Sequence, residues 1–110
     1  MDTEANDIII DMSQLVLIEV EAYYSANPDK FKKFVDIKNN NGRSLREIQL
    51  MVSGIDNKYY PSYQKQLKNY GKLLFDPFCR TKHKFNFKGI DTSIGQLNFF
   101  KWLFENNLVN

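Results

Sequence analysis

The chain has 110 residues, of which 43% are hydrophobic and 15% aromatic. This composition predicts one globular domain spanning residues 1–110 and excludes a disordered chain. The one cysteine, Cys79, excludes an intramolecular disulfide framework and is typical of proteins in a reducing compartment. No stretch approaches 18 apolar residues, and no basic segment precedes an apolar run near the start. We therefore expect a soluble intracellular protein that is neither secreted nor inserted in a membrane.

The first part of the chain allows two interpretations. The isoleucine run at residues 8–10 fits a buried strand or the lead-in to a helix. From Asp11 onward, apolar residues recur at intervals of three and four, which predicts a helix through Tyr23, although its β-branched content keeps a strand as the alternative. One face of this helix would hold Leu15, Ile18 and Ala22. Pro28 then favours the first turn of a second helix.

Two further helices are expected in the middle of the chain. After a loop at residues 39–42, rich in Asn and Gly, Ser44 and Glu47 form a capping box that predicts a helix start. The apolar face of this helix holds Leu45, Ile48, Val52 and Ile55. The next helix begins at Pro61 or Ser62.

The helix after Pro61 has the clearest amphipathic pattern in the chain. Its spacing predicts a buried face of Tyr63, Leu67, Tyr70 and Leu74. Another face holds Lys65, Lys68 and Lys72. Gly71 predicts fraying or a bend near the end of the helix, because glycine weakens a helix interior.

A strand and an aromatic helix are expected in the last third of the chain. Residues 84–88 alternate polar and aromatic side chains, which predicts a half-buried strand that ends at Gly89. Ser93 and Gln96 form a capping box, so a helix begins near Ile94. Its apolar stripe comprises Leu97, Phe99, Phe100, Leu103, Phe104 and Leu108, and we interpret this stripe as core. Its solvent side is expected to hold Asn98, Lys101 and Glu105.

The chain end supplies the candidate partner for this strand. Residues 108–109 follow two asparagines that favour a helix end, and they can begin a strand beside residues 85–87. The predicted fold class is therefore α+β: a single small domain, mostly helical, with a short antiparallel strand pair near the C-terminus.

Charge divides the chain into three parts. Residues 1–36 carry eight acidic residues and three lysines, a net charge of −5. Residues 37–88 carry eleven basic and three acidic residues, a net charge of +8. The remaining part, with the aromatic helix expected over residues 93–107, carries −1. Such asymmetry indicates a surface for polyanions, because each lysine that contacts a phosphate releases counterions.

The candidate phosphate-binding residues are Lys65, Lys68, Lys72, Arg80, Lys82 and Lys84. Aromatic residues that could stack unpaired bases lie among these charges, namely Tyr59, Tyr60, Phe85 and Phe87. Two structural interpretations compete with this one. The lysines can form an ordinary solvated face, or the basic middle can neutralise the acidic N-terminal part of the same or a neighbouring chain.

We expect no enzyme, no metal site and no cofactor. His83 lies between basic residues that disfavour its protonated form, and no nucleophile is assigned to it. Cys79 and His83 are spaced as one pair of ligands without a second pair, so Cys79 is interpreted as a buried structural thiol. Asp76 and Asp91 could meet in space as a pair of catalytic carboxylates, but such a pair cannot be inferred from the sequence. The chain has no phosphate-binding glycine loop and no hydrolase or metalloprotease motif.

Two segments carry a resemblance to a known family: DPFCR at residues 76–80 and TSIGQLNFFKW at residues 92–102. Over residues 44–110 the chain resembles a functionally uncharacterised family of small proteins encoded by nucleocytoplasmic large DNA viruses. The resemblance implies no catalytic residues. The segment after Leu50 is less aromatic than in that family, and the C-terminal end is shorter.

Two classes of function follow from charge and resemblance together. The first is a small non-enzymatic viral protein that binds DNA or RNA through its basic middle segment, in transcription or genome packaging. The alternative is a protein-interaction or virion-assembly module without nucleic-acid contact, whose partners are other viral proteins or a second copy. Either function places the protein in the host cell cytoplasm or the virion.

Overall fold

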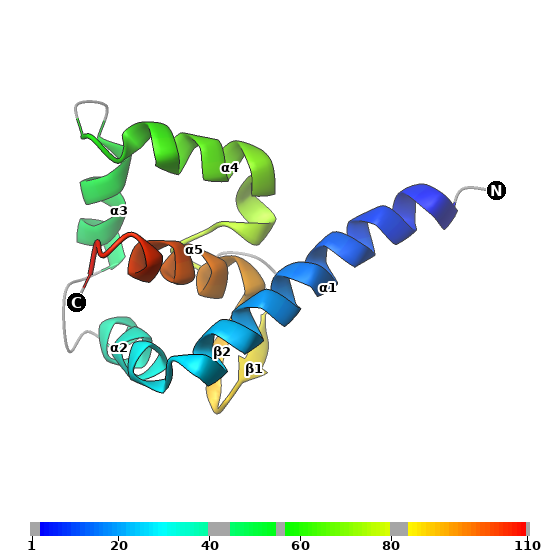
Figure 1. The fold of residues 1–110 in the computed structure, drawn as a ribbon, viewed down its shortest axis with the longest axis horizontal. Coiled ribbons are helices and arrows are strands. Elements are labelled where there is room, and N and C mark those ends of the chain that lie inside the picture. The colour runs from blue at the N-terminus through cyan, green and yellow to red at the C-terminus, as the bar shows by residue number, and fades with distance from the viewer. Residues whose placement is uncertain (1–2, 40–44, 55–56, 80–83, 110) are drawn as a thin grey trace.

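A computed structural model of the chain describes residues 3–39, 45–54, 57–79 and 84–109. In chain order the elements are α1 (Thr3–Ala26), α2 (Pro28–Lys38), α3 (Leu45–Ser53), α4 (Tyr60–Leu74), β1 (Phe85–Phe87), β2 (Ile90–Thr92) and α5 (Ile94–Glu105). This order confirms the predicted α+β class, mostly helical with an antiparallel strand pair near the C-terminus. Figure 1 shows α5 in the middle, with α4 above it, α3 at its upper left, α2 and the strand pair below it, and α1 running from below α5 to the upper right.

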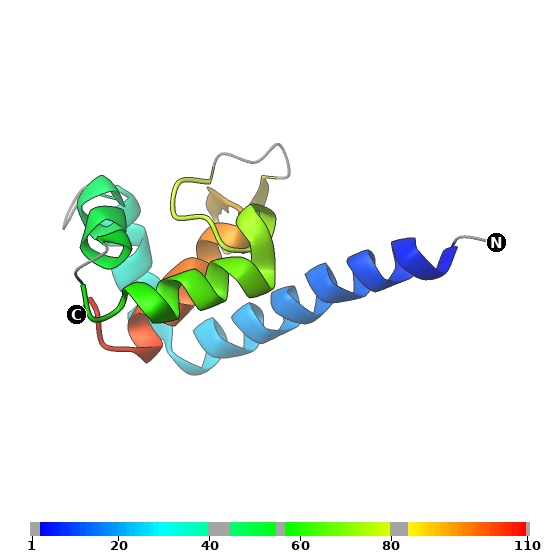
Figure 2. The same cartoon turned by 90° about the horizontal axis from the view of Figure 1, so that it is seen from above.

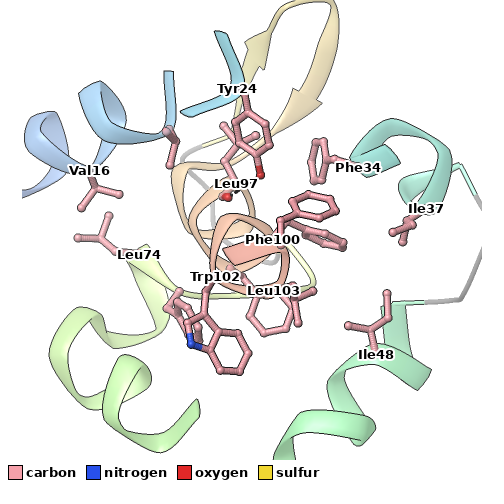
Figure 3. Packing of buried hydrophobic residues seen from close by; sticks show 14 of the residues in the cluster. Val16, Tyr24, Phe34, Ile37, Ile48, Leu74, Leu97, Phe100, Trp102 and Leu103 are labelled. Carbon is pink, nitrogen blue, oxygen red and sulfur yellow. Dashed lines mark hydrogen bonds between the residues drawn. The ribbon is translucent and has the colours of Figure 1, made fainter. Parts of the chain in front are cut away.

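Helix α5 is buried on almost every side. The Ser93 hydroxyl accepts a hydrogen bond from the Gln96 amide at 3.1 Å, so the expected cap at the helix start is confirmed. Four apolar side chains of α5 have no exposed surface: Leu97, Phe99, Phe100 and Leu103. A helix that is apolar around its circumference needs partners on all sides. Figure 3 shows that the surrounding helices supply them.

The core combines aromatic and aliphatic side chains from every helix. The buried partners of α5 are Val16, Val20, Tyr24, Phe34, Ile37, Ile48, Val52, Tyr63 and Leu74. Aromatic rings meet mainly edge to face, as rings prefer; Phe34 and Phe100 have centroids 5.0 Å apart, and Phe75 and Phe99 have centroids 5.2 Å apart. The interpretation of the apolar stripe of α5 as part of the core is therefore confirmed.

The prediction that Asn98 faces solvent is wrong. Asn98 is buried, and its side-chain amide donates to the main-chain oxygen of Leu74 at 2.8 Å. The last carbonyls of a helix lack partners within the helix, and Asn98 supplies one at the end of α4. Lys101 is half-buried, Glu105 is exposed, and the two form an ion pair at 3.1 Å.

The strand pair is a hairpin, and its second strand is not the expected one. Strand β1 pairs antiparallel with β2, with Phe87 opposite Ile90. The turn between them has positive φ at Lys88 and Gly89 (52° and 90°), as a tight two-residue hairpin turn requires. The strand proposed at residues 108–109 is wrong. There the chain leaves α5 through Asn107, which has a φ of 56°, and the Leu108 amide donates to the Leu103 oxygen at 2.9 Å.

Helix α1 begins at Thr3, so the strand alternative at residues 8–10 is wrong. A helix satisfies its own backbone hydrogen bonds, whereas a strand needs a neighbour to pair with. Figures 1 and 2 show the first half of α1 extending beyond the other elements, where it has no such neighbour. The face that packs on the core holds Val16, Val20 and Tyr24. The expected face of Leu15, Ile18 and Ala22 exists but is exposed.

Several local predictions are confirmed. Pro28 lies in the first turn of α2, and a proline lies in the first turn of α4. Ile48 and Val52 form the buried face of α3. The capping residue Ser44, the loop after residue 39 and Ile55 lie outside the described residues.

The Tyr24 hydroxyl yields a prediction about stability. It donates to the main-chain oxygen of Leu97 at 2.9 Å, and burial raises the pKa of Tyr24 well above 10.0, with smaller contributions from Tyr23 and Glu105. Tyr24→Phe is expected to lower the free energy of unfolding by about 1 kcal/mol at pH 7. Above pH 10 Tyr24 ionises in the unfolded chain but stays neutral in the folded protein, so the free energy of unfolding of wild type falls. Tyr24→Phe lacks this ionisation, so the difference in free energy of unfolding between wild type and the variant narrows.

Urea denaturation at pH 7 and at pH 10.5 measures both effects. Tyr60→Phe is the control, because no hydrogen bond of its hydroxyl to another described residue is found. Equal stability of wild type and Tyr24→Phe at pH 7 would contradict the assignment of this hydrogen bond.

Candidate nucleic-acid interface

Helix α4 carries the candidate lysines on the side away from its buried apolar residues. Tyr63 and Leu74 are buried, and Leu67 and Tyr70 are half-buried against the core. The lysine face comprises Lys65, Lys68 and Lys72, and all three side chains are exposed. The amphipathic pattern predicted for this helix is confirmed.

A kink interrupts the lysine face. Gly71 has φ 74° and ψ 171°, which is not helical, so the predicted bend is confirmed. Only glycine adopts this backbone conformation without strain. Lys65 and Lys68 therefore lie on the straight part of α4, while Lys72 lies on the turn that follows the kink. The helical spacing used to align the three lysines applies to the first two.

Within the part of the chain that the structure describes, no neighbouring carboxylate neutralises the lysine face. Helix α4 contains three lysines and no acidic residue. Among the described residues, no carboxylate forms an ion pair with any of the three. Lys101, by contrast, is paired with Glu105. A row of unpaired ammonium groups raises the local positive potential beyond what the net charge of +2 indicates.

The structure separates Lys84 from the lysine face. Lys84 is exposed directly before β1, and in Figure 1 the hairpin lies on the opposite side of α5 from α4. The hairpin also carries the exposed Lys88. Arg80 and Lys82 lie outside the described residues. The predicted set is therefore divided: Lys65, Lys68 and Lys72 lie on α4, with the first two before its kink, and Lys84 lies beside the hairpin.

The aromatic residues of the predicted site do not form a stacking platform beside the lysines. Phe87 is buried, with its ring centroid 5.7 Å from Phe31 and 6.2 Å from Tyr24. Phe85 is half-buried against Phe87, at 6.0 Å. Tyr59 and Tyr60 are half-buried at the start of α4. The expectation that Phe87 can stack bases is wrong, because the core uses its ring.

A buried polar junction, which the sequence reasoning missed, joins the loop after α4 to the start of α5. Gln96 has no exposed surface, and its side-chain oxygen accepts from Lys38 and from Thr92, each at 2.8 Å. Its side-chain nitrogen donates to the Pro77 oxygen at 2.8 Å. Lys38 was counted with the basic middle segment, but its ammonium group is committed to this junction. In the predicted capping box, Gln96 was expected to reach back to the helix start instead.

Close backbone contact explains the glycine in this junction. The amide of Asp76 donates to the Gly95 oxygen at 3.2 Å, and the Asp76 side chain accepts from the Phe78 amide at 3.1 Å. A Cβ atom on residue 95 would lie 2.6 Å from the Leu73 oxygen. The DPFCR and TSIGQLNFFKW segments thus pack against each other, and only glycine fits at position 95.

The described residues that were considered for catalysis or metal binding differ in burial and in location. Cys79 is buried, as predicted, whereas His83 lies outside the described residues. Asp76 is buried in the junction, and Asp91 is exposed on the hairpin, where it accepts from Asn86 at 3.2 Å. Within the described part of the chain, no group of three His, Cys, Asp or Glu residues is arranged to hold a metal ion. No helix there has the length and apolarity needed to cross a membrane.

Comparison with known proteins identifies the family. Residues 9–110 match the family of unknown function DUF7197. The chain belongs to this family. It is 32% identical over 112 residues to the uncharacterized protein L507 of Acanthamoeba polyphaga mimivirus. This match confirms the expected link to an uncharacterised family of large DNA viruses.

The two proteins differ in length. The alignment covers 92% of this chain and 39% of the mimivirus protein, so the chain spans about two fifths of that relative. No solved structure matches the chain.

The polar junction yields a prediction for Gly95→Ala. The added methyl group must displace the backbone at Leu73, which is expected to lower the free energy of unfolding by about 1–3 kcal/mol. Urea denaturation measures the change. Gly54→Ala is the matched control, because its Cβ meets nothing closer than the Leu50 oxygen at 3.6 Å, and a change within about 0.5 kcal/mol is expected. Equal stability of the two variants would contradict the close packing of α4 against α5.

Proposed function

We propose that this chain is a non-enzymatic nucleic-acid-binding protein that holds the phosphate backbone on the lysine face of α4. The observation that carries the proposal is a row of exposed lysines on a helix without a carboxylate. Lysine ammonium groups bind phosphates as point charges, and each contact is favoured by counterion release.

The arrangement of the aromatic residues refines the kind of binding that we propose. Because Phe87 is part of the core and Phe85 packs against it, the lysine face has no aromatic ring from the hairpin to stack on bases. Phosphate contacts carry little sequence information by themselves. We therefore expect binding that is independent of sequence, accepts single and double strands, and has a micromolar to sub-millimolar Kd at physiological salt.

The family supports a viral setting for this function. The relationship to a mimivirus protein favours a role in viral transcription or genome packaging, in the host cell cytoplasm or in the virion. We also propose that the DPFCR and TSIGQLNFFKW segments are shared among relatives, because they meet in the buried junction around Gln96.

The hairpin side is proposed as a second, separate contact. Lys84 is exposed there, and Arg80 and Lys82 precede it in the sequence. A long nucleic acid can contact both surfaces, whereas a short oligonucleotide on α4 does not need the hairpin. Lys84→Glu is therefore expected to weaken the binding of short oligonucleotides less than changes on α4 do.

A double charge reversal tests the lysine face. Lys65→Glu with Lys68→Glu is expected to weaken binding of a labelled oligonucleotide at least tenfold, because attraction to phosphate becomes repulsion. The plot of log K against log salt has a negative slope, and this slope is expected to become shallower by about two units, since two phosphate contacts are lost. Fluorescence anisotropy over a salt series measures both quantities for single-stranded and double-stranded DNA and RNA.

The matched control is Lys32→Glu with Lys33→Glu, which makes the same change in net charge at two exposed lysines of α2. If net charge alone governed binding, the two double variants would be equally weak. Equal weakening, or no binding by wild type at low salt, would remove the proposed function.

A further inference from the structure

Helix α1 presents a stripe of large apolar side chains to solvent. Met12, Leu15 and Ile18 have 44%, 59% and 61% of their surfaces exposed. The three residues recur at intervals of three along α1. Leu15 and Ile18 lie on the side away from the buried face of Val16 and Val20, whereas Met12, four positions before Val16, lies at the edge between the two sides. We call these three residues, with the exposed Ala22, the α1 stripe. Contiguous exposed apolar surface on a soluble protein marks an interaction site.

The charges on α1 restrict what can cover this stripe. Thr3–Ala26 contains five acidic residues and no basic residue. Glu19 and Glu21 are exposed and border the stripe, because they follow Leu15 by four positions and Ile18 by three. A partner must therefore offer apolar contact flanked by positive charge. Two α1 helices side by side would bring like charges together, which disfavours pairing of α1 with itself.

The lysine face of α4 has the complementary chemistry. It carries unpaired lysines, and the methylene stems of lysine side chains cover apolar surface while their ammonium groups reach outward. Leu73, beside Lys72, has 45% of its surface exposed and adds an apolar contact at the end of the row. The rise of an α-helix gives the α1 stripe a length of roughly 15 Å, whereas Lys65 and Lys68 on the straight part of α4 lie about 5 Å apart along the helix, so these two lysines can contact part of the stripe.

We propose that the α1 stripe of one copy of this chain packs against the lysine face of α4 of a second copy. The contact is between chains, because the stripe lies on the side of α1 that faces away from its own core. When α1 of each copy packs on α4 of the other copy, the same contact forms twice and closes a two-fold dimer. Figure 2 shows the first half of α1 extending beyond the other elements, and the α1 stripe begins near the end of this half and continues on the exposed side of the second half.

This contact has a consequence for nucleic-acid binding. The carboxylates of α1 and the phosphates of a nucleic acid would occupy the same lysines, so self-association and binding to α4 are expected to compete. Self-association does not require the proposed function, and either can fail while the other holds.

A charge exchange between two variants tests the contact. The first variant carries Lys65→Glu with Lys68→Glu, and the second carries Glu19→Lys with Glu21→Lys. In a dimer of either variant with itself, α1 and α4 would carry charges of the same sign where they meet. Each variant alone is therefore expected to remain at the monomer mass of 13.0 kDa. An equimolar mixture restores opposite charges at both contacts and is expected to have twice that mass, as wild type does. Light scattering coupled to gel filtration measures the masses, and recovery in the mixture shows that both variants are folded.

The apolar part of the contact is tested by Leu15→Glu, which is expected to reduce the association constant at least tenfold. Leu50→Glu is the matched control, because Leu50 is a leucine of α3 with a similar exposed fraction, 55%, and lies outside both surfaces. Wild type that stays monomeric at millimolar concentration, a mixture that stays monomeric, or equal weakening by Leu15→Glu and Leu50→Glu would each overturn the proposal. Leu15→Glu keeps every lysine of α4 and adds no positive charge that could itself bind phosphate, so its oligonucleotide binding tests the proposed function separately.

Discussion

Helix α5 has almost no face left for water, and the arrangement of the other helices follows from this burial. Leu97, Phe99, Phe100 and Leu103 point in different directions around the helix and are all fully buried. An apolar helix of this kind is stable only when partners surround it. The buried faces of α1, α2, α3 and α4 therefore share one core (Figure 3), although α1 and α5 lie at opposite ends of the chain.

Burial of α5 also imposes a polar constraint. Gln96 and Asn98 cannot reach water, and a buried amide without partners costs about 1–3 kcal/mol. Both amides donate to main-chain oxygens: Asn98 to Leu74 at the end of α4, and Gln96 to Pro77 in the segment that follows it. Among the described residues, every buried side-chain nitrogen and oxygen has a hydrogen-bond partner. The polar groups inside the protein thus hold the fold together, which directs the search for function to its surface.

The sequence predicted those elements whose two faces differ. Helix α4 separates the apolar residues Tyr63, Leu67, Tyr70 and Leu74 from its lysines, so its buried face and its lysine face were foreseen, and Gly71 indicated its bend. Helix α1 is apolar on two faces, and spacing alone did not show that Val16 and Val20, rather than Leu15 and Ile18, face the core. That choice depends on which side α5 occupies, which is a long-range property of the fold.

Two other differences have local causes. Strand β2 has only three residues, too few for an alternating pattern to stand out before the cap of α5, and so its pairing with β1 was missed. Asn98 was assigned to solvent because it lies outside the apolar stripe of the predicted helix. Its burial depends on the Leu74 oxygen at the end of α4, 24 residues earlier. The candidate site was foreseen on α4, but its separation from the hairpin required the fold.

The distribution of charge gives the surface its character. The net charge of +2 is the sum of opposite charges in different places: α1 is acidic, α4 is basic, and both helices lie on the outside of one small core. A partner at the surface responds to the nearest charges, because salt screens exposed charges beyond about 8 Å at physiological ionic strength. The lysines of α4 therefore decide the potential close to that helix, although the five acidic residues of α1 lower the net charge of the whole chain to +2. The same screening means that an acidic helix must make direct contact with the lysines in order to compete for them. Its apolar stripe supplies a reason for such contact that charge alone does not.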